Sequence, residues 1–394
     1  MKPLPITDCT AASALGVGRE AMLSTLRAGR GGLRFQHFET AALETWIGLA
    51  EGLDDAPLPA DLAEWECRNN RLAWMALQAD GFAESVARAA QRWGRRRVGL
   101  FLGTSTSAIL ETEIAYRHRD PDTGALPAGF RYEQTHNTGS VAAFARQVLG
   151  LEGPAFVVST ACSSSAKVFA NAQRMIALGL IDAAVVGGVD SLCLTTLYGF
   201  NSLELLSREP SRPWDAHRHG LSIGEAGAFA LLERESDAPA AWLLGCGESS
   251  DGFHMSSPHP EGLGAIAAMR GALAQAGLQP EGVDYVNLHG TATSNNDAAE
   301  DAAVRAVFGT AVPCSSTKGA TGHTLGAAGA LEAVICMLAL HHGFMPGGLN
   351  RLTPDPALQC RYLDANQEAT LSVVASNSFG FGGSNACLLL GAAR

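Results

Sequence analysis

Residues 155–165, Ala-Phe-Val-Val-Ser-Thr-Ala-Cys-Ser-Ser-Ser, decide the fold and locate the first reactive group. Four apolar residues, typical of a short buried strand, run directly into a cysteine with small polar neighbours. Apolar residues then recur at helical spacing over residues 166–178, and a second apolar strand follows at residues 183–186 before a pair of glycines. Strand, helix and strand in this order predict a βαβ unit, in a sheet with parallel members that is covered on both faces.

The same alternation continues on both sides of this unit. An apolar run at residues 98–102 predicts a further strand in the first half. In the second half, the expected elements are a strand, a helix, a strand, an alanine-rich helix and two paired strands around a glycine turn, at residues 283–288, 296–308, 312–315, 325–341, 371–376 and 386–390.

The two halves resemble each other faintly. Residues 157–160 lead into a long apolar helix, and so do residues 314–317, which suggests an internal duplication. A chain of 394 residues is also long for one simple hydrophobic core. We therefore expect two halves, residues 1–238 and residues 239–394, with the boundary in the pattern break near residue 238.

The composition excludes several functions. The net charge of −11 argues against nucleic-acid binding, because phosphate contacts need a basic surface. An acidic protein can still dock an acidic partner through a local basic patch, for which Arg68 and Arg71 are candidates, although such arginines more often form solvated ion pairs. Nine cysteines without a CxxC pair argue against a disulfide framework and fit a reducing compartment. No signal peptide or membrane span is apparent, so we expect a cytoplasmic protein.

Three residues are candidates for chemistry. Cys162 precedes an expected helix, whose positive end stabilises a thiolate. A structural cysteine is the alternative, but its neighbours are normally larger and apolar. His289 ends an expected strand, and His323 lies in a loop that opens a helix. Either histidine alone could be a loop residue bonded to backbone, but two histidines and a cysteine at strand ends indicate a nucleophilic site.

Other ligand classes are disfavoured. Residues 319–322 lack the spacing of a P-loop, and no GxGxxG run follows a strand, so the sequence does not indicate a nucleotide site. His254 and His259 are five residues apart across a proline, which fits a surface loop better than a metal site. We expect no metal and no resident cofactor.

The chain contains four motifs that together resemble the β-ketoacyl-acyl-carrier-protein synthases, the elongating condensing enzymes of the thiolase superfamily. The motifs lie, in the family's order, at residues 159–164, 289–293, 318–323 and 377–384, and residues 211–215 and 224–227 also match. The similarity covers nearly the whole chain. It implies a thiolase-like α/β fold, with two similar halves in five αβαβα layers, and a dimer.

The resemblance also implies roles. Cys162 would accept an acyl group from the phosphopantetheine of acyl carrier protein, and His289 and His323 would stabilise the enolate formed as malonyl-carrier protein loses CO2. Lys318 would set the electrostatics of the histidine pair, with Glu300 as its partner. The backbone N–H groups of Cys162 and Phe381 would form an oxyanion hole. The expected substrate contacts are Thr291, Thr293, Phe200, Phe379 and the gating residue Phe381.

Two segments depart from the family pattern. After Thr293 the family has a proline and a glycine before the aspartate, whereas this chain has Ser294, Asn295 and Asn296. Residues 103–112 differ from the glycine-rich form of housekeeping fatty acid synthases. Because the family shapes its acyl pocket and carrier entrance there, the departures suggest a specialised synthase, for example one that builds aryl polyenes or another polyketide-like chain with a cysteine-less chain-length partner.

Two alternatives remain beside an active stand-alone synthase. A coenzyme A-dependent thiolase-type acyltransferase shares the fold but uses a second cysteine near its C-terminus, and Cys387 lacks the accompanying Cys-Gly-Gly motif. A non-catalytic capping subunit would have lost its nucleophile, whereas Cys162 is present. The sequence leaves open whether the dimer is a homodimer or a heterodimer that needs a chain-length partner.

Overall fold

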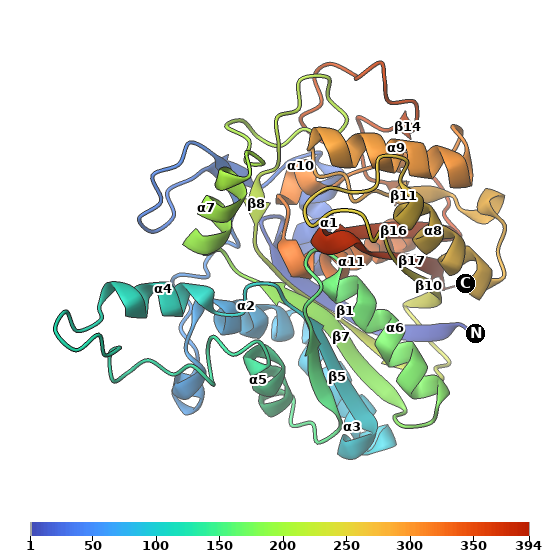
Figure 1. Ribbon diagram of the computed structural model, residues 1–394. Coiled ribbons are helices and arrows are strands. Elements are labelled where there is room, and N and C mark those ends of the chain that lie inside the picture. Colours follow the sequence, from blue (N-terminus) through green and yellow to red (C-terminus); the bar gives the residue numbers. More distant parts are fainter. Residues whose placement is uncertain (1, 394) are drawn as a thin grey trace.

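The fold is built on one large mixed sheet. A computed structural model describes residues 2–393, and Figure 1 shows the sheet crossing the molecule with helices on both sides. In the N-terminal half the strand order is β6-β5-β7-β9-β1. These strands are β1 (Leu4–Ser13), β5 (Val98–Gly103), β6 (Ala155–Val158), β7 (Ala183–Asp190) and β9 (Ala226–Glu233).

The C-terminal half continues the sheet through a short antiparallel pairing of β1 with β10. Its strand order is β10-β17-β16-β11-β12-β14. These strands are β10 (Ala241–Ser250), β11 (Tyr285–Asn287), β12 (Pro313–Ser315), β14 (Arg361–Tyr362), β16 (Val373–Gly380) and β17 (Ser384–Ala392).

The halves share one topology. From β1 outward the pairings are antiparallel, antiparallel, parallel and parallel, and the same sequence of pairings starts at β10. Each half also inserts one long helix at the same point, α6 (Ser164–Ala177) between β6 and β7, and α11 (Ala328–His342) between β12 and β16. The two similar halves expected from the sequence are therefore confirmed.

The two halves of the sheet form two layers, and helices form the other three. α6 and α11 pack on each other and contact strands of both halves, so they lie in the middle. One outer face is covered by α2 (Arg68–Leu77), α3 (Phe82–Trp93) and α5 (Ser140–Val148), and the other by α8 (Leu263–Ala276) and α9 (Ser294–Phe308). One apolar cluster surrounds the middle helices, and two separate clusters fill the spaces under the outer helices. This arrangement confirms the expected five layers.

Smaller elements surround this body. β3 (Leu33–Phe35), β4 (Trp46–Gly48) and β8 (Ile223–Gly224) form a three-stranded sheet, and β13 (Phe344–Met345) pairs with β15 (Gln367–Glu368). The remaining elements include β2 (Gly16–Val17), α1 (Arg19–Arg27), α4 (Ile109–Arg117), α7 (Leu194–Ser202) and α10 (Lys318–Thr321). Both figures show α4 and the loop after it projecting from the body.

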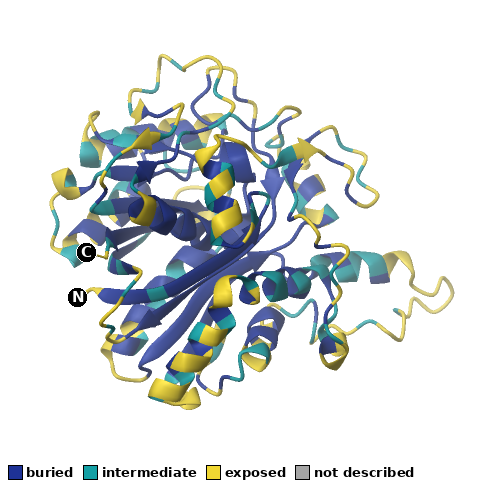
Figure 2. Ribbon diagram, turned by 180° about the vertical axis from the view of Figure 1, so that it is seen from behind, coloured by how far each residue is buried: buried dark blue, intermediate teal, exposed yellow. Residues whose placement is uncertain are grey.

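The middle helix α11 is apolar enough to resemble a membrane span. Residues Leu325–His342 pass that test by length and hydropathy, alone among the described residues, but 89% of the segment is buried. Figure 2 shows the central strands and the helices between them as the most buried part of the protein. The hydropathy of α11 is therefore explained by its place between the two halves of the large sheet.

Candidate active site

The nucleophile loop lies where β6 meets α6. Ala161 has a φ of 52°, a conformation that is strained for a residue with a side chain and that turns the chain sharply before Cys162. Gly380 allows the turn after β16 to lie against this loop, because a Cβ there would be 2.6 Å from the carbonyl oxygen of Thr160. The loops of the two halves thus meet at the buried Cys162 side chain.

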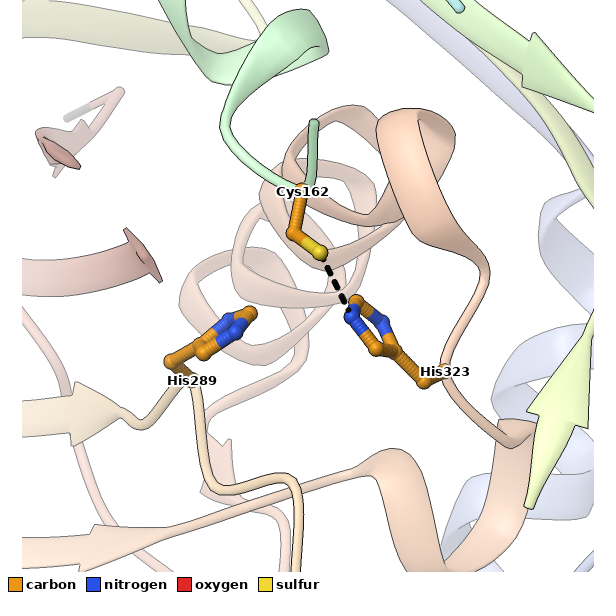
Figure 3. A group of neighbouring side chains, drawn as sticks. All are labelled: Cys162, His289 and His323. Carbon is orange, nitrogen blue, oxygen red and sulfur yellow. Dashed lines mark hydrogen bonds between the residues drawn. The ribbon is translucent and has the colours of Figure 1, made fainter. Parts of the chain in front are cut away.

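His289 and His323 bring two imidazoles to the sulfur (Figure 3). His289 follows β11, and His323 follows α10. The Nε2 atom of His323 lies 2.9 Å from Sγ of Cys162. The two rings are edge to face, with centroids 5.3 Å apart, and both residues are buried. The structure therefore brings together the three residues chosen from the sequence.

Lys318 lies behind His289, but its partner differs from the expected one. Its ammonium forms a buried ion pair with Glu332 of α11 and lies 3.5 Å from Nδ1 of His289. The pairing of Lys318 with Glu300 was wrong. The physical reason is that the carboxylate of Glu300 is occupied by the backbone of the histidine loop.

Glu300 instead holds the histidine loop by its backbone. Its carboxylate accepts hydrogen bonds from the N–H groups of His289 and Gly290, each at 2.8 Å, and from Nδ2 of Asn377 at 3.1 Å. Burial raises the pKa of Glu300 to about 7, although these hydrogen bonds oppose the shift. Glu300 thus positions His289 and does not line the cavity.

Both active-site histidines are neutral at physiological pH. Burial lowers the pKa of His289 well below 6.5, and the charge of Lys318 and the proximity of His323 add to the effect. Burial and Lys318 likewise lower the pKa of His323. An ammonium group is only a donor, so Nδ1 of His289 must accept and its ring proton must lie on Nε2.

Cys162 differs from the expectation of a thiolate stabilised by the helix. Burial raises the pKa of the Cys162 thiol to about 12, and Lys318 and two backbone N–H groups only partly offset this. Desolvation of the charge therefore outweighs the helix dipole. The two opposing N–H groups belong to Phe381 and to Cys162 itself, the residues expected to form the oxyanion hole.

A cavity of about 400 Å³ leads from the surface to the three reactive side chains. All five residues expected to contact substrate line it, namely Thr291, Thr293, Phe200, Phe379 and Phe381. The hydroxyls of Thr291 and Thr293 are 2.9 Å apart, and the rings of Phe200 and Phe381 are 5.5 Å apart. The unusual residues Ser294, Asn295 and Asn296 also line the cavity.

Sequence reasoning missed two buried acids near the site. Glu332 is the only acidic residue in α11, and an acid within a buried apolar helix normally has a partner, which was the available signal. Asp190 ends β7 and accepts hydrogen bonds from the hydroxyls of Thr104 and Thr106 and from the N–H of Ala327. It thereby ties the loop after β5 to the start of α11.

The suggested basic patch does not form. Arg68 is ion-paired with the buried Glu225 and with Asp54, and Arg71 is paired with Glu66. Arg71 fits the alternative of a solvated ion pair, whereas Arg68 is buried against Glu225.

Comparison with known proteins identifies the family. Residues 69–238 match the family described as the β-ketoacyl synthase N-terminal domain, and residues 240–351 match the β-ketoacyl synthase C-terminal domain. The chain belongs to the β-ketoacyl synthase family, and its thiolase-like fold is that of the solved ketosynthases.

Three relatives show the extent of the similarity. The mitochondrial 3-oxoacyl-(acyl-carrier-protein) synthase of Arabidopsis thaliana is 42% identical over 262 residues, which span 61% of this chain and 57% of that protein. Nodulation protein E of Rhizobium meliloti (strain 1021) is 37% identical over 306 residues, spanning 74% of this chain and 75% of that protein. The ketosynthase ApeO, solved in complex with its chain length factor ApeC from Xenorhabdus doucetiae, is 40% identical with a TM-score of 0.90, over 100% of this chain and 98% of that chain.

Proposed function

We propose that this protein catalyses decarboxylative Claisen condensation, in which an acyl group on Cys162 is joined to a malonyl-acyl-carrier-protein to give a 3-oxoacyl-acyl-carrier-protein. The observation that carries the proposal is a pair of buried, neutral imidazoles beside a buried thiol at the end of one cavity. Neutral histidines can donate hydrogen bonds to a thioester oxygen without a desolvated positive charge.

The first half-reaction loads the acyl group. The Cys162 thiol is protonated, and Nε2 of His323 at 2.9 Å can accept its proton as the sulfur attacks the thioester carbon. The negative charge then developing on the thioester oxygen is met by the backbone N–H groups of Cys162 and Phe381. When the C–S bond to phosphopantetheine breaks, the departing thiolate takes the proton back from His323.

The second half-reaction forms the carbon–carbon bond. As the malonyl group loses CO2, the electron pair of the breaking bond moves into the thioester to form an enolate. Nε2–H of His289 donates to the enolate oxygen, and His323 joins it after its ring proton has exchanged from Nδ1 to Nε2 through water. The enolate carbon attacks the acyl carbon, and the Cys162–acyl bond breaks as the carbonyl of the 3-oxoacyl product re-forms. The released Cys162 thiolate takes one proton from solvent, which balances the loss of CO2. Lys318 fixes the donor tautomer of His289, and Glu300 fixes its backbone.

The thiolase-type alternative has less support. Cys162 is the only cysteine among the described residues that line the cavity. Cys387 packs in the apolar cluster under α8 and α9, on the outer face of the sheet. The position beside Cys162 is instead filled by a second histidine, which suits decarboxylation better than thiolysis by coenzyme A.

Several partner assignments belong to the same proposal. The substrates arrive on the phosphopantetheine of acyl carrier protein, and no resident cofactor is needed. The protein acts in the cytoplasm as a dimer, with the half 1–238 supplying Cys162 and the half 239–394 supplying both histidines. ApeO was solved in complex with its chain length factor, and its 40% identity over 98% of its chain supports a heterodimer with a chain-length partner. The chain that is elongated is a fatty acid or a polyketide-like product such as an aryl polyene.

The test is a product assay. The purified protein is incubated with malonyl-carrier protein and a panel of acyl-carrier proteins, and the carrier species are weighed by mass spectrometry. A carrier-bound 3-oxoacyl product two carbons longer, absent with Cys162→Ala, is expected and would identify the preferred acyl group. If Cys162 is neither acylated nor needed for product, with or without a co-expressed chain-length partner, the proposal is wrong.

A further inference from the structure

The three reactive side chains also make a set of metal ligands. One ligand atom each from Cys162, His289 and His323 lies within 4.8 Å of the other two, and all three residues are buried. Thiolate and imidazole are the preferred ligands of Zn2+, and three protein ligands with one open position are a common zinc arrangement. Tetrahedral bonds of about 2.0–2.3 Å place ligand atoms roughly 3.5 Å apart, so small side-chain movements would close this set on an ion.

Two of the three ligands are free to bind. Nδ1 of His323 has no hydrogen-bond partner among the described residues, so the ring can carry its proton there and present Nε2 to a metal. The sulfur of Cys162 lies 2.9 Å from that Nε2 atom, and a thiol loses its proton on coordination.

His289 is not free to bind a metal in the same way, because the Lys318 ammonium contacts its ring nitrogen Nδ1. The ammonium lies 3.5 Å from Nδ1 and cannot accept a proton from it, so Nδ1 is an acceptor and Nε2 holds the proton. The lone pair of Nδ1 accepts a hydrogen bond from the ammonium and Nε2 carries the ring proton, so neither nitrogen has a free lone pair for a metal. The ion pair with Glu332 holds the ammonium in place in the buried site. Lys318 also repels a dication by its charge.

We propose that Lys318 keeps Zn2+ and similar borderline-soft divalent cations out of the Cys162–His289–His323 triangle, by holding His289 with its proton on Nε2. Without Lys318, the thiol and the two imidazoles would bind Zn2+, and bound zinc would block the nucleophile Cys162. Metal exclusion is independent of the proposed condensation, since it depends only on contacts among the protein's own side chains.

The test measures zinc binding, not activity. Wild type, Lys318→Met, Lys318→Met/Cys162→Ala and Lys167→Met are dialysed against graded zinc chloride, and bound zinc per chain is measured. Lys167 is a matched control, because it pairs with Glu248 at 3.9 Å and does not line the cavity. Zinc bound elsewhere is common to all four proteins and is removed by difference.

Lys318→Met is expected to gain one zinc per chain, with affinity about 10- to 100-fold higher than wild type, the range typical of groups that orient a metal-binding histidine. The gain should disappear with Cys162→Ala, and Lys167→Met should behave as wild type. Equal affinity in wild type and Lys318→Met, or a gain that survives Cys162→Ala, would overturn the proposal.

A second measurement needs no substitution at Lys318. Alkylation of Cys162 by iodoacetamide is followed in the wild type by peptide mass spectrometry, with and without micromolar zinc chloride. The rate is expected to be unchanged by zinc. Zinc-dependent protection of Cys162 in the wild type would overturn the proposal even if Lys318→Met failed to fold.

Discussion

Glu332→Met should destabilise the protein strongly, and Lys318→Met should rescue it. Glu332 and Lys318 form an ion pair in which both side chains are almost fully buried. Removing the carboxylate leaves the ammonium buried without a counter-charge, which typically costs about 3–5 kcal/mol. Methionine has a similar length and suits a helix, so packing changes little. In the double variant no charge is left unpaired, and most of the loss should return.

The cost of Lys318→Met should depend on pH. Burial raises the pKa of Glu332 to about 7, so after Lys318→Met this carboxyl can take up a proton below neutral pH and avoid a buried charge. Because a raised pKa in the folded state makes stability fall as pH rises, Lys318→Met is expected to cost more at pH 8 than at pH 6.

The assay is guanidinium unfolding followed by circular dichroism, at one protein concentration because assembly shifts apparent stability. Arg71→Met combined with Lys318→Met is the control, and the two effects should add within about 0.5 kcal/mol because Arg71 pairs with Glu66 and shares no partner with Lys318. The reasoning would be refuted if Glu332→Met cost less than about 1 kcal/mol, or if the double variant lost as much as the two single variants together.

Three further predictions follow from the same contacts. The pKa of Glu300 is raised from 4.5 to about 7, so the folded state binds more protons than the unfolded state between these pH values, and the contribution of Glu300 to stability should fall by roughly 3 kcal/mol as pH rises from 4.5 to 7. Glu300→Gln should flatten this part of the stability profile in unfolding measurements, and an unchanged slope would contradict the buried carboxyl. Gly380→Ala puts a Cβ 2.6 Å from the Thr160 carbonyl oxygen and should lower the free energy of unfolding by about 1–3 kcal/mol. It should also slow acylation of Cys162, as measured by intact mass, and acylation at the wild-type rate would show that the turn can move. His323→Ala should slow acylation of Cys162 by roughly 10²–10⁴-fold. His289→Ala should leave acylation nearly intact and abolish condensation. Equal effects of the two variants on both steps would contradict the proton transfer assigned to His323 and the enolate contact assigned to His289.

Cys162 and His289 could be chosen from the sequence because each follows an apolar strand, whereas His323 follows the short helix α10. That the three side chains meet could not be read from the strand pattern, because β6 and β11 lie in different halves of the sheet and only the packing of the halves brings their ends together. The predicted ends of the helices were less accurate. The helix expected from residue 296 begins at Ser294, directly after the extended residue Thr293.

The partner of Lys318 could not be chosen from sequence in the same way. The helix that carries Glu300 also contains Asp297 and Asp301, all buried, and nothing in the spacing says which acid faces which loop. The true partner, Glu332, lies in a different helix whose composition is typical of pure core. Only the packing of α11 between the two halves of the sheet brings the carboxylate of Glu332 to Lys318.

The measurement that tests the central claim most directly is the stoichiometry of CO2 release. The protein, with its chain-length partner if one is required, is given an acyl-carrier protein of the preferred length and malonyl-carrier protein labelled in the free carboxyl carbon. One labelled CO2 per 3-oxoacyl product is predicted, with product formation lost in Cys162→Ala and in His289→Ala. Product that retains the labelled carbon, or product formed at the wild-type rate without His289, would contradict decarboxylative condensation at this site.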